Sequence, residues 1–210
     1  METKQKIYNL NNSKITEYVD KNIIVFEDII NDEFCKELIQ FIESNKDHFE
    51  EEILGTHYNV ECFNLYLEVL KKKLDSNNLS SILEIDQKIF LIIGQIIIAL
   101  HAILMGFNGK EDSGYNLRKI FGGTKIHTDS ITTGGYKEYI RCASVIINLN
   151  DDYDGGIFNF PKQDFSIKLK KGSAIVFPPY WTHPHEVSKV GEGQSRYTIN
   201  TWLQEKLNNV

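Results

Sequence analysis

The residues with the clearest potential for chemistry lie in the second half of the chain, beginning with the sequence "HTD". It places His127 and Asp129 one residue apart. In an extended strand, residues i and i+2 point to the same face, so an imidazole and a carboxylate could meet at one point. A surface turn can hold such a pair by chance, so the pair alone is weak evidence for a metal site. A third ligand elsewhere in the chain would strengthen it.

Candidate third ligands lie in the sequence "FPPYWTHPHEV", which contains His183 and His185. Two histidines and one carboxylate form the facial set that binds non-haem Fe(II) and leaves positions open for a co-substrate and O₂. Both histidines share a face if the segment is extended, so spacing leaves the choice between them open. Further along, Arg196 could hold the distal carboxylate of a chelating 2-oxo acid, because a guanidinium stays charged and offers two parallel donors.

The bulk composition indicates one folded domain of 210 residues, since a chain of this length can bury roughly 70% of its unfolded surface. A net charge of −6 argues against general nucleic-acid binding, which needs clustered cations. Three widely spaced cysteines form no C-x-x-C pair, so they indicate neither a disulfide framework nor a zinc ribbon. No secretory leader is evident at the N-terminus, and we expect a cytoplasmic location.

The first half of the chain predicts helices that support the rest. A strand over Ile23 to Phe26 leads to a helix capped by Asn31, and a second helix is expected from Glu61 to Leu74. The apolar run that ends at Phe107 approaches the length of a membrane span. We interpret it as a buried helix instead, because its apolar residues follow a three-four spacing. These residues are Ile82, Ile85, Ile89, Ile92, Ile96, Leu100, Ile103 and Phe107.

After Gly114 the pattern changes to short β-branched or aromatic runs separated by turn residues, which predicts strands. We therefore expect an α+β domain over residues 1–210. Residues 1–113 would be mostly helical support, and residues 114–204 would form a strand-built roll that carries the site.

Several sequence blocks resemble the 2-oxoglutarate and Fe(II)-dependent dioxygenases, and most closely their prolyl 4-hydroxylase-like branch. The blocks are "HTD", "RCASVIINLNDDYDGGIFNFP", "KKGSAIVFPP", "HEV" and "RYTINTW", and the opening "NIIVFEDIINDEFCKELI" is also similar. The resemblance covers the chain from about Ile23 onward. It implies a double-stranded β-helix, a jelly roll of the cupin type, buttressed by N-terminal helices. It also implies hydroxylation with O₂ that releases succinate and CO₂, with ascorbate as a possible added reductant.

The resemblance assigns roles residue by residue. His127, Asp129 and His185 would bind iron, and "HEV" favours His185 over His183. Arg196 would hold the distal carboxylate, and further pocket residues would be Thr198, Asn148 and Ile146, with Asn200 and Trp202 continuing the same face. Many members place a co-substrate tyrosine where this chain has Leu117 and Arg118; Tyr115, Arg118 or Lys119 are candidate replacements.

The substrate is the least determined part of this interpretation. A peptidyl proline in a peptide or protein is the leading candidate, with Ser130 to Tyr139 as a candidate lid. A free amino acid, a small metabolite or a nucleic-acid base are alternatives. Arg141 could contact substrate or be a solvated charge. A noncatalytic metal-binding sensing module is the competing class, and the complete triad with Arg196 counts against it.

Overall fold

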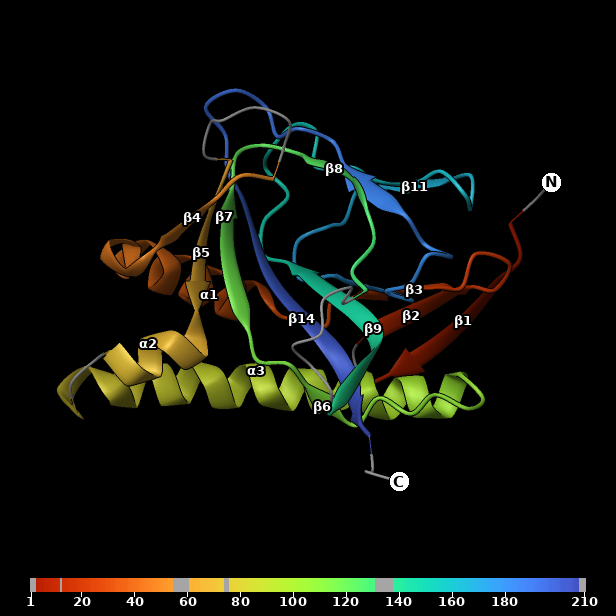
Figure 1. Cartoon of the computed structure of the whole chain (residues 1–210), viewed down its shortest axis with the longest axis horizontal. Coiled ribbons are helices and arrows are strands. Elements are labelled where there is room, and N and C mark those ends of the chain that lie inside the picture. The colour runs from red at the N-terminus through yellow and green to blue at the C-terminus, as the bar shows by residue number, and fades with distance from the viewer. Residues whose placement is uncertain (1–2, 12, 55–60, 74–75, 131–137, 208–210) are drawn as a thin grey trace.

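The computed structural model describes residues 3–11, 13–54, 61–73, 76–130 and 138–207. These residues form an α+β jelly roll in which a large antiparallel sheet faces a smaller one, and helices cover the outer face of the large sheet (Figure 1). The helices are α1 (Asp32–Ser44), α2 (Leu67–Lys73) and α3 (Ser76–Ile103), with a 3-10 turn, η1, at Lys46–His48.

The large sheet takes strands from both halves of the chain. Its members are β1 (Gln5–Leu10), β2 (Ser13–Tyr18), β3 (Ile23–Glu27), β4 (Glu50–Glu52), β5 (Cys62–Tyr66), β6 (Glu111–Asp112), β7 (Asn116–Ile120), β9 (Tyr139–Asn148), β12 (Ala174–Phe177) and β14 (Arg196–Lys206). They run in the order β1-β2-β3-β12-β9-β14-β7-β5-β4, with β6 paired to β14. The smaller sheet runs β11 (Phe165–Ile167), β10 (Phe158–Phe160), β13 (His185–Val187) and β8 (Thr124–His127).

Strand alternation gives the large sheet two buried faces. On β3, Ile24 and Phe26 face the helices and join the same cluster as Leu38 of α1. Ile23 and Val25 face the other way, into a cluster that includes Phe158, Phe160 and Phe177. One face of the sheet is therefore closed by helices, and the other faces the smaller sheet.

The predicted start of α1 is confirmed. The Asn31 side chain accepts a hydrogen bond of 2.8 Å from the Phe34 amide, which satisfies one of the free N–H groups of the first turn. The predicted apolar helix is confirmed as α3, although it ends at Ile103, before Phe107. Its buried residues, among them Ile82, Ile89 and Ile96, pack against the large sheet. In the part of the chain that the structure describes, no helix is both long and apolar enough to cross a membrane.

The helix expected from Glu61 to Leu74 is wrong in its first half. Residues Cys62–Tyr66 form β5, and only Leu67–Lys73 are helical. The reason is tertiary, because β5 is paired on both sides, with β4 and with β7. The expectation of mostly helical support over residues 1–113 also needs correction, since six strands in that range extend the large sheet.

The turn before β12 generates a stability prediction. Gly172 has φ +73°, and a Cβ built there would lie 2.3 Å from the Ile30 carbonyl oxygen. The Gly172 carbonyl also accepts hydrogen bonds from the amides of Ile29 and Ile30. Gly172→Ala is expected to lower the free energy of unfolding by about 3 kcal/mol, because it adds a backbone clash to the strain of a left-handed residue.

Gly193→Ala is the matched control for Gly172→Ala. Gly193 has φ +74°, but a Cβ there has no neighbour within 4 Å. It should lose only about 1 kcal/mol, the strain alone. Urea unfolding of both variants measures the difference, and equal losses would contradict the close approach to Ile30.

Candidate active site

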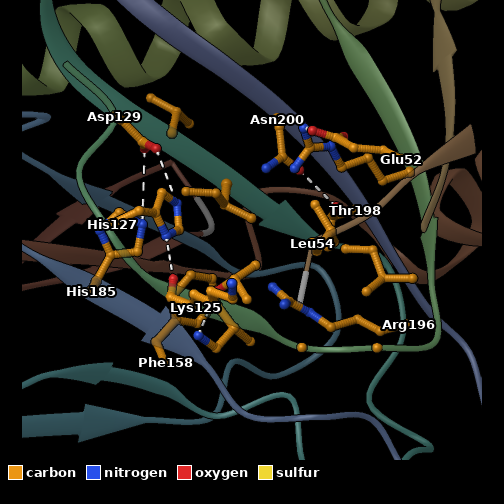
Figure 2. A pocket seen from close by; sticks show the side chains of 18 of the residues that line it. Glu52, Leu54, Lys125, His127, Asp129, Phe158, His185, Arg196, Thr198 and Asn200 are labelled. Carbon is orange, nitrogen blue, oxygen red and sulfur yellow. Dashed lines mark hydrogen bonds and ion pairs between the residues drawn. The ribbon is translucent and has the colours of Figure 1, made fainter. Parts of the chain in front are cut away.

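Three side chains converge where β8 and β13 pair. His127, the last residue of β8, lies opposite His185, the first residue of β13, and Asp129 follows two residues after His127. The His127 Nε2 lies 3.5 Å from Asp129 Oδ1, and the His185 Nε2 lies 4.0 Å from Asp129 Oδ2. One ligand atom of each residue lies within 4.8 Å of the others, so the three could hold one metal ion (Figure 2).

Hydrogen bonds orient each of these side chains. The His127 Nδ1 lies 2.7 Å from the Lys125 carbonyl, and the His185 Nδ1 lies 3.1 Å from the His183 carbonyl. A proton on each Nδ1 leaves each Nε2 lone pair free for a metal. Ser144 donates to Asp129 Oδ2 at 2.6 Å, which fixes the carboxylate.

The charges of the cluster also fit a divalent cation. Burial opposes ionisation of Asp129, but the hydrogen bonds with His127 and Ser144 hold the pKa of its carboxyl well below the usual range. Burial lowers the pKa of His185, so this imidazole stays neutral near pH 7. A carboxylate anion beside a neutral imidazole is what an Fe(II) site requires.

Arg196, the first residue of β14, is a buried cation without a carboxylate partner among the described residues. Its side chain is 2% exposed, its Nε donates to Asn148 Oδ1 at 2.9 Å, and its Nη2 has no hydrogen-bond partner in the part of the chain described. Burial lowers the pKa of this guanidinium. Burying a charged group with an unpaired donor costs free energy unless an anion binds to it. We therefore interpret Arg196 as the binding residue for a carboxylate.

One cavity of about 340 Å³ joins the His127, Asp129 and His185 cluster to Arg196. The cluster lies on one side of the cavity, and Arg196 and Thr198 lie on the other (Figure 2). A small dicarboxylate could therefore reach the metal ligands with one end and the guanidinium with the other.

The comparisons with known proteins agree with this geometry. A model of the 2OG-Fe(II) oxygenase superfamily matches residues 115–204, the part that contains the cluster and Arg196. This region belongs to the 2OG-Fe(II) oxygenase superfamily. The match indicates a dioxygenase that uses Fe(II) and 2-oxoglutarate (2OG), with O₂ as the oxidant. The sequence has no significant match among curated proteins.

Solved structures show the same fold at low identity. The viral collagen prolyl hydroxylase of Paramecium Bursaria Chlorella virus-1, in complex with 2OG, has 18% identity and a TM-score of 0.61, covering 88% of this chain and 96% of its own. A Trichoplax adhaerens prolyl hydroxylase, in complex with a peptide fragment of the hypoxia inducible factor oxygen degradation domain, has 14% identity and a TM-score of 0.63, with coverages of 87% and 83%. A Pseudomonas putida prolyl-4-hydroxylase has 14% identity and a TM-score of 0.58, with coverages of 88% and 93%.

The structure separates the two histidines that the sequence left ambiguous. His183 follows a turn, and its Nε2 lies 2.8 Å from the Lys21 carbonyl. Its side chain is 2% exposed and does not line the 2OG oxygenase cavity. The segment around Pro184 is therefore not fully extended, and only His185 reaches Asp129.

Three of the expected or candidate pocket residues do not line the cavity. Tyr115 lies on the helix side of the large sheet, where its hydroxyl donates to Asp112 Oδ2 at 2.9 Å. Strand alternation explains this, because Leu117 of β7 shares that face and Arg118 points the other way. Asn148 lies behind Arg196 and fixes it, whereas Thr198, Ile146, Asn200 and Trp202 line the cavity as expected. Lys119 points away from it and pairs with Glu43.

Sequence reasoning missed Tyr153, which completes the support of Arg196. The Tyr153 hydroxyl donates to the same Asn148 Oδ1 at 3.0 Å. A Cβ at Gly156 would lie 2.5 Å from the Tyr153 ring and 3.3 Å from the Arg196 side chain, so this glycine allows the two to pack. The double glycine was a visible signal, but its partner could be found only in three dimensions. The candidate lid falls largely on residues 131–137, outside the described residues.

The support of Asp129 predicts a loss of metal affinity in Ser144→Ala. Removing a hydrogen bond to a ligating carboxylate costs about 10-fold in affinity, because the ligand is no longer held in place. Mn(II) binding by calorimetry measures the loss. Ser166→Ala is the control, since the exposed Ser166 donates to the side-chain oxygen of Asn159 away from the cluster; equal affinities of the two variants would contradict the role of Ser144.

The Asn148 side-chain amide, which accepts a hydrogen bond from Arg196, generates a second prediction for this site. Asn148→Asp would place a carboxylate on the Arg196 Nε, where it competes with the distal carboxylate of 2OG. We expect the dissociation constant of 2OG to rise by at least about 10-fold, measured with Mn(II) in place of iron. Unchanged 2OG affinity would show that Arg196 is not the anion site.

Proposed function

We propose that this dioxygenase hydroxylates prolyl residues in a peptide or protein substrate and releases succinate and CO₂. The observation that carries its chemistry is one cavity that joins the His127, Asp129 and His185 cluster to the buried Arg196 guanidinium, whose Nη2 has no hydrogen-bond partner among the described residues. The proposal treats residues 1–210 as one domain, since strands before β7 extend the same sheet that carries Arg196.

In this proposal His127, Asp129 and His185 bind Fe(II), and Arg196 with Thr198 binds the distal carboxylate of 2OG. When bound, the iron and 2OG supply the oxidising chemistry, in which one atom of O₂ enters succinate and the other hydroxylates the substrate. The chain's own residues keep the ligands in place through Ser144 and the carbonyls behind each imidazole. Phe160 and Phe177 pack against the His185 ring and exclude water from that side.

The substrate class is supported by an aromatic surface beside the metal ligands. Trp202 lines the cavity, and the Arg141 guanidinium lies 3.7 Å from the centre of its ring. Arg141 also donates to the Asp129 carbonyl at 2.7 Å, so the pair is tied to the cluster. Tyr180 donates to the Arg141 carbonyl, and the neighbouring Trp181 is exposed. Aromatic surfaces of this kind bind proline-containing peptides, whose extended backbone is already ordered.

The comparisons support a peptide as substrate. The related folds are those of prolyl hydroxylases, and one was solved with a peptide fragment. A cytoplasmic location is part of the proposal and is supported by the free thiols of Cys35, Cys62 and Cys142.

The experiment is succinate release from 2OG under air, with Fe(II) and ascorbate, across a panel of proline-containing peptides and matched alanine peptides. Wild-type turnover should rise with some proline peptides only, and Asp129→Ala should abolish it. Trp202→Ala should raise the KM for peptide by about 10-fold, because it removes the aromatic surface, while 2OG binding with Mn(II) stays within about threefold. Mass spectrometry should find one added oxygen on proline.

Each outcome decides between the candidates. Turnover that depends on Asp129 but ignores every peptide would overturn the peptidyl-proline proposal in favour of a small metabolite, free amino acid or nucleic-acid base. Absence of succinate with every substrate, despite bound metal, would favour a sensing module.

A further inference from the structure

A second cation lies in the cavity, paired with an acid. Arg118 of β7 has a side chain only 14% exposed, and its Nη2 lies 3.2 Å from Glu52 Oε2 of β4. Glu52 also accepts a hydrogen bond of 2.6 Å from Asn64, which holds the carboxylate in place. Both Arg118 and Glu52 line the same cavity as Arg196, so the ion pair is part of the pocket wall.

The strand register places this second cation next to the first. Arg118 lies opposite Thr198, and Ile120 lies opposite Arg196, in the pairing of β7 with β14. Arg118 and Arg196 are therefore diagonal neighbours on one face of the sheet, a separation that two long side chains can bridge. The positive charge of Arg118 acts on the Arg196 guanidinium and on the His127 imidazole, and it contributes to lowering the pKa of Arg196.

The charges on this wall leave room for one more anion. Two guanidiniums and one carboxylate give an excess of one positive charge, and the Nη2 of Arg196 has no hydrogen-bond partner among the described residues. The distal carboxylate of 2OG would neutralise it. Neighbouring guanidiniums repel each other, so an anion bound between them stabilises both charges.

We propose that Arg118 binds the distal carboxylate of 2OG together with Arg196, and that Glu52 competes with 2OG for Arg118. This inference rests on the proposed function. It assigns Arg118 a direct contact with the co-substrate, and it makes Glu52 a residue that sets co-substrate affinity by occupying Arg118 while the cavity lacks an anion.

The proposal predicts opposite effects for two isosteric changes. Arg118→Gln should weaken 2OG binding by roughly 10-fold or more, because one of two charge-assisted contacts is lost. Glu52→Gln keeps an oxygen for the Asn64 contact but removes the competing charge, and it should tighten 2OG binding roughly threefold to 10-fold. Calorimetric titration of the Mn(II)-loaded full chain with 2OG measures both without turnover.

Two controls distinguish loss of the contact between Arg118 and 2OG from a general disturbance of the site. Lys119→Gln alters the next residue of β7, whose side chain pairs with Glu43 away from the cavity, and should leave 2OG affinity unchanged. 2-Oxobutyrate keeps the chelating end of 2OG but lacks the distal carboxylate. Arg118→Gln should weaken 2OG binding while leaving 2-oxobutyrate binding within about twofold.

Failure of this inference is distinguishable from failure of the proposed function. If the wild-type protein binds 2OG and releases succinate, but Arg118→Gln binds 2OG equally well or loses 2OG and 2-oxobutyrate in parallel, the inference is overturned and the function stands. Weaker 2OG binding in Glu52→Gln would contradict the proposal that Glu52 competes with 2OG for Arg118. If the wild-type protein does not bind 2OG at all, both are overturned.

Discussion

The burial of both faces of the large sheet is the constraint on which the rest of the structure depends. Each central strand sends alternate residues to the helices and to the smaller sheet, so a shift by one residue would exchange the two sets. On β14, Ile199 and Leu203 pack toward the helices, which requires Arg196 and Thr198 to point into the cavity. The same rule turns Arg118 inward and Tyr115 outward. The apolar core thus decides which polar side chains can take part in chemistry.

The smaller sheet supplies the second requirement, a meeting point for ligands that are distant in the sequence. The pairing of β8 with β13 sets His127 opposite His185. Asp129 lies just beyond the end of β8, and Ser144 of β9 in the large sheet holds its carboxylate. A metal site at the junction of the two sheets therefore depends on their packing, and the helices contribute by stabilising the large sheet from its other face.

Electrostatics divides the cavity into two ends with different tasks. At the metal end, a buried carboxylate faces two imidazoles, one of them made less basic by burial. At the other end, two guanidiniums face one carboxylate. Such separation of charge suits a co-substrate with a chelating group and a distal anion, because a divalent cation held at the metal end would attract the chelating group and the guanidiniums would attract the distal anion.

The sequence by itself determined the elements with strong local signals. These are the Asn31 cap, the apolar face of α3 and the strands after Gly114, and the order of the motifs was enough to identify the oxygenase superfamily. Local rules could not identify β5, since its strand conformation comes from pairing with β4 and β7. They also could not show that Tyr115 faces the helices, that Tyr153 supports Asn148, or that Glu52 reaches Arg118. Those contacts join residues far apart in the chain, so only the packing of the two sheets and the register of their strands could decide them.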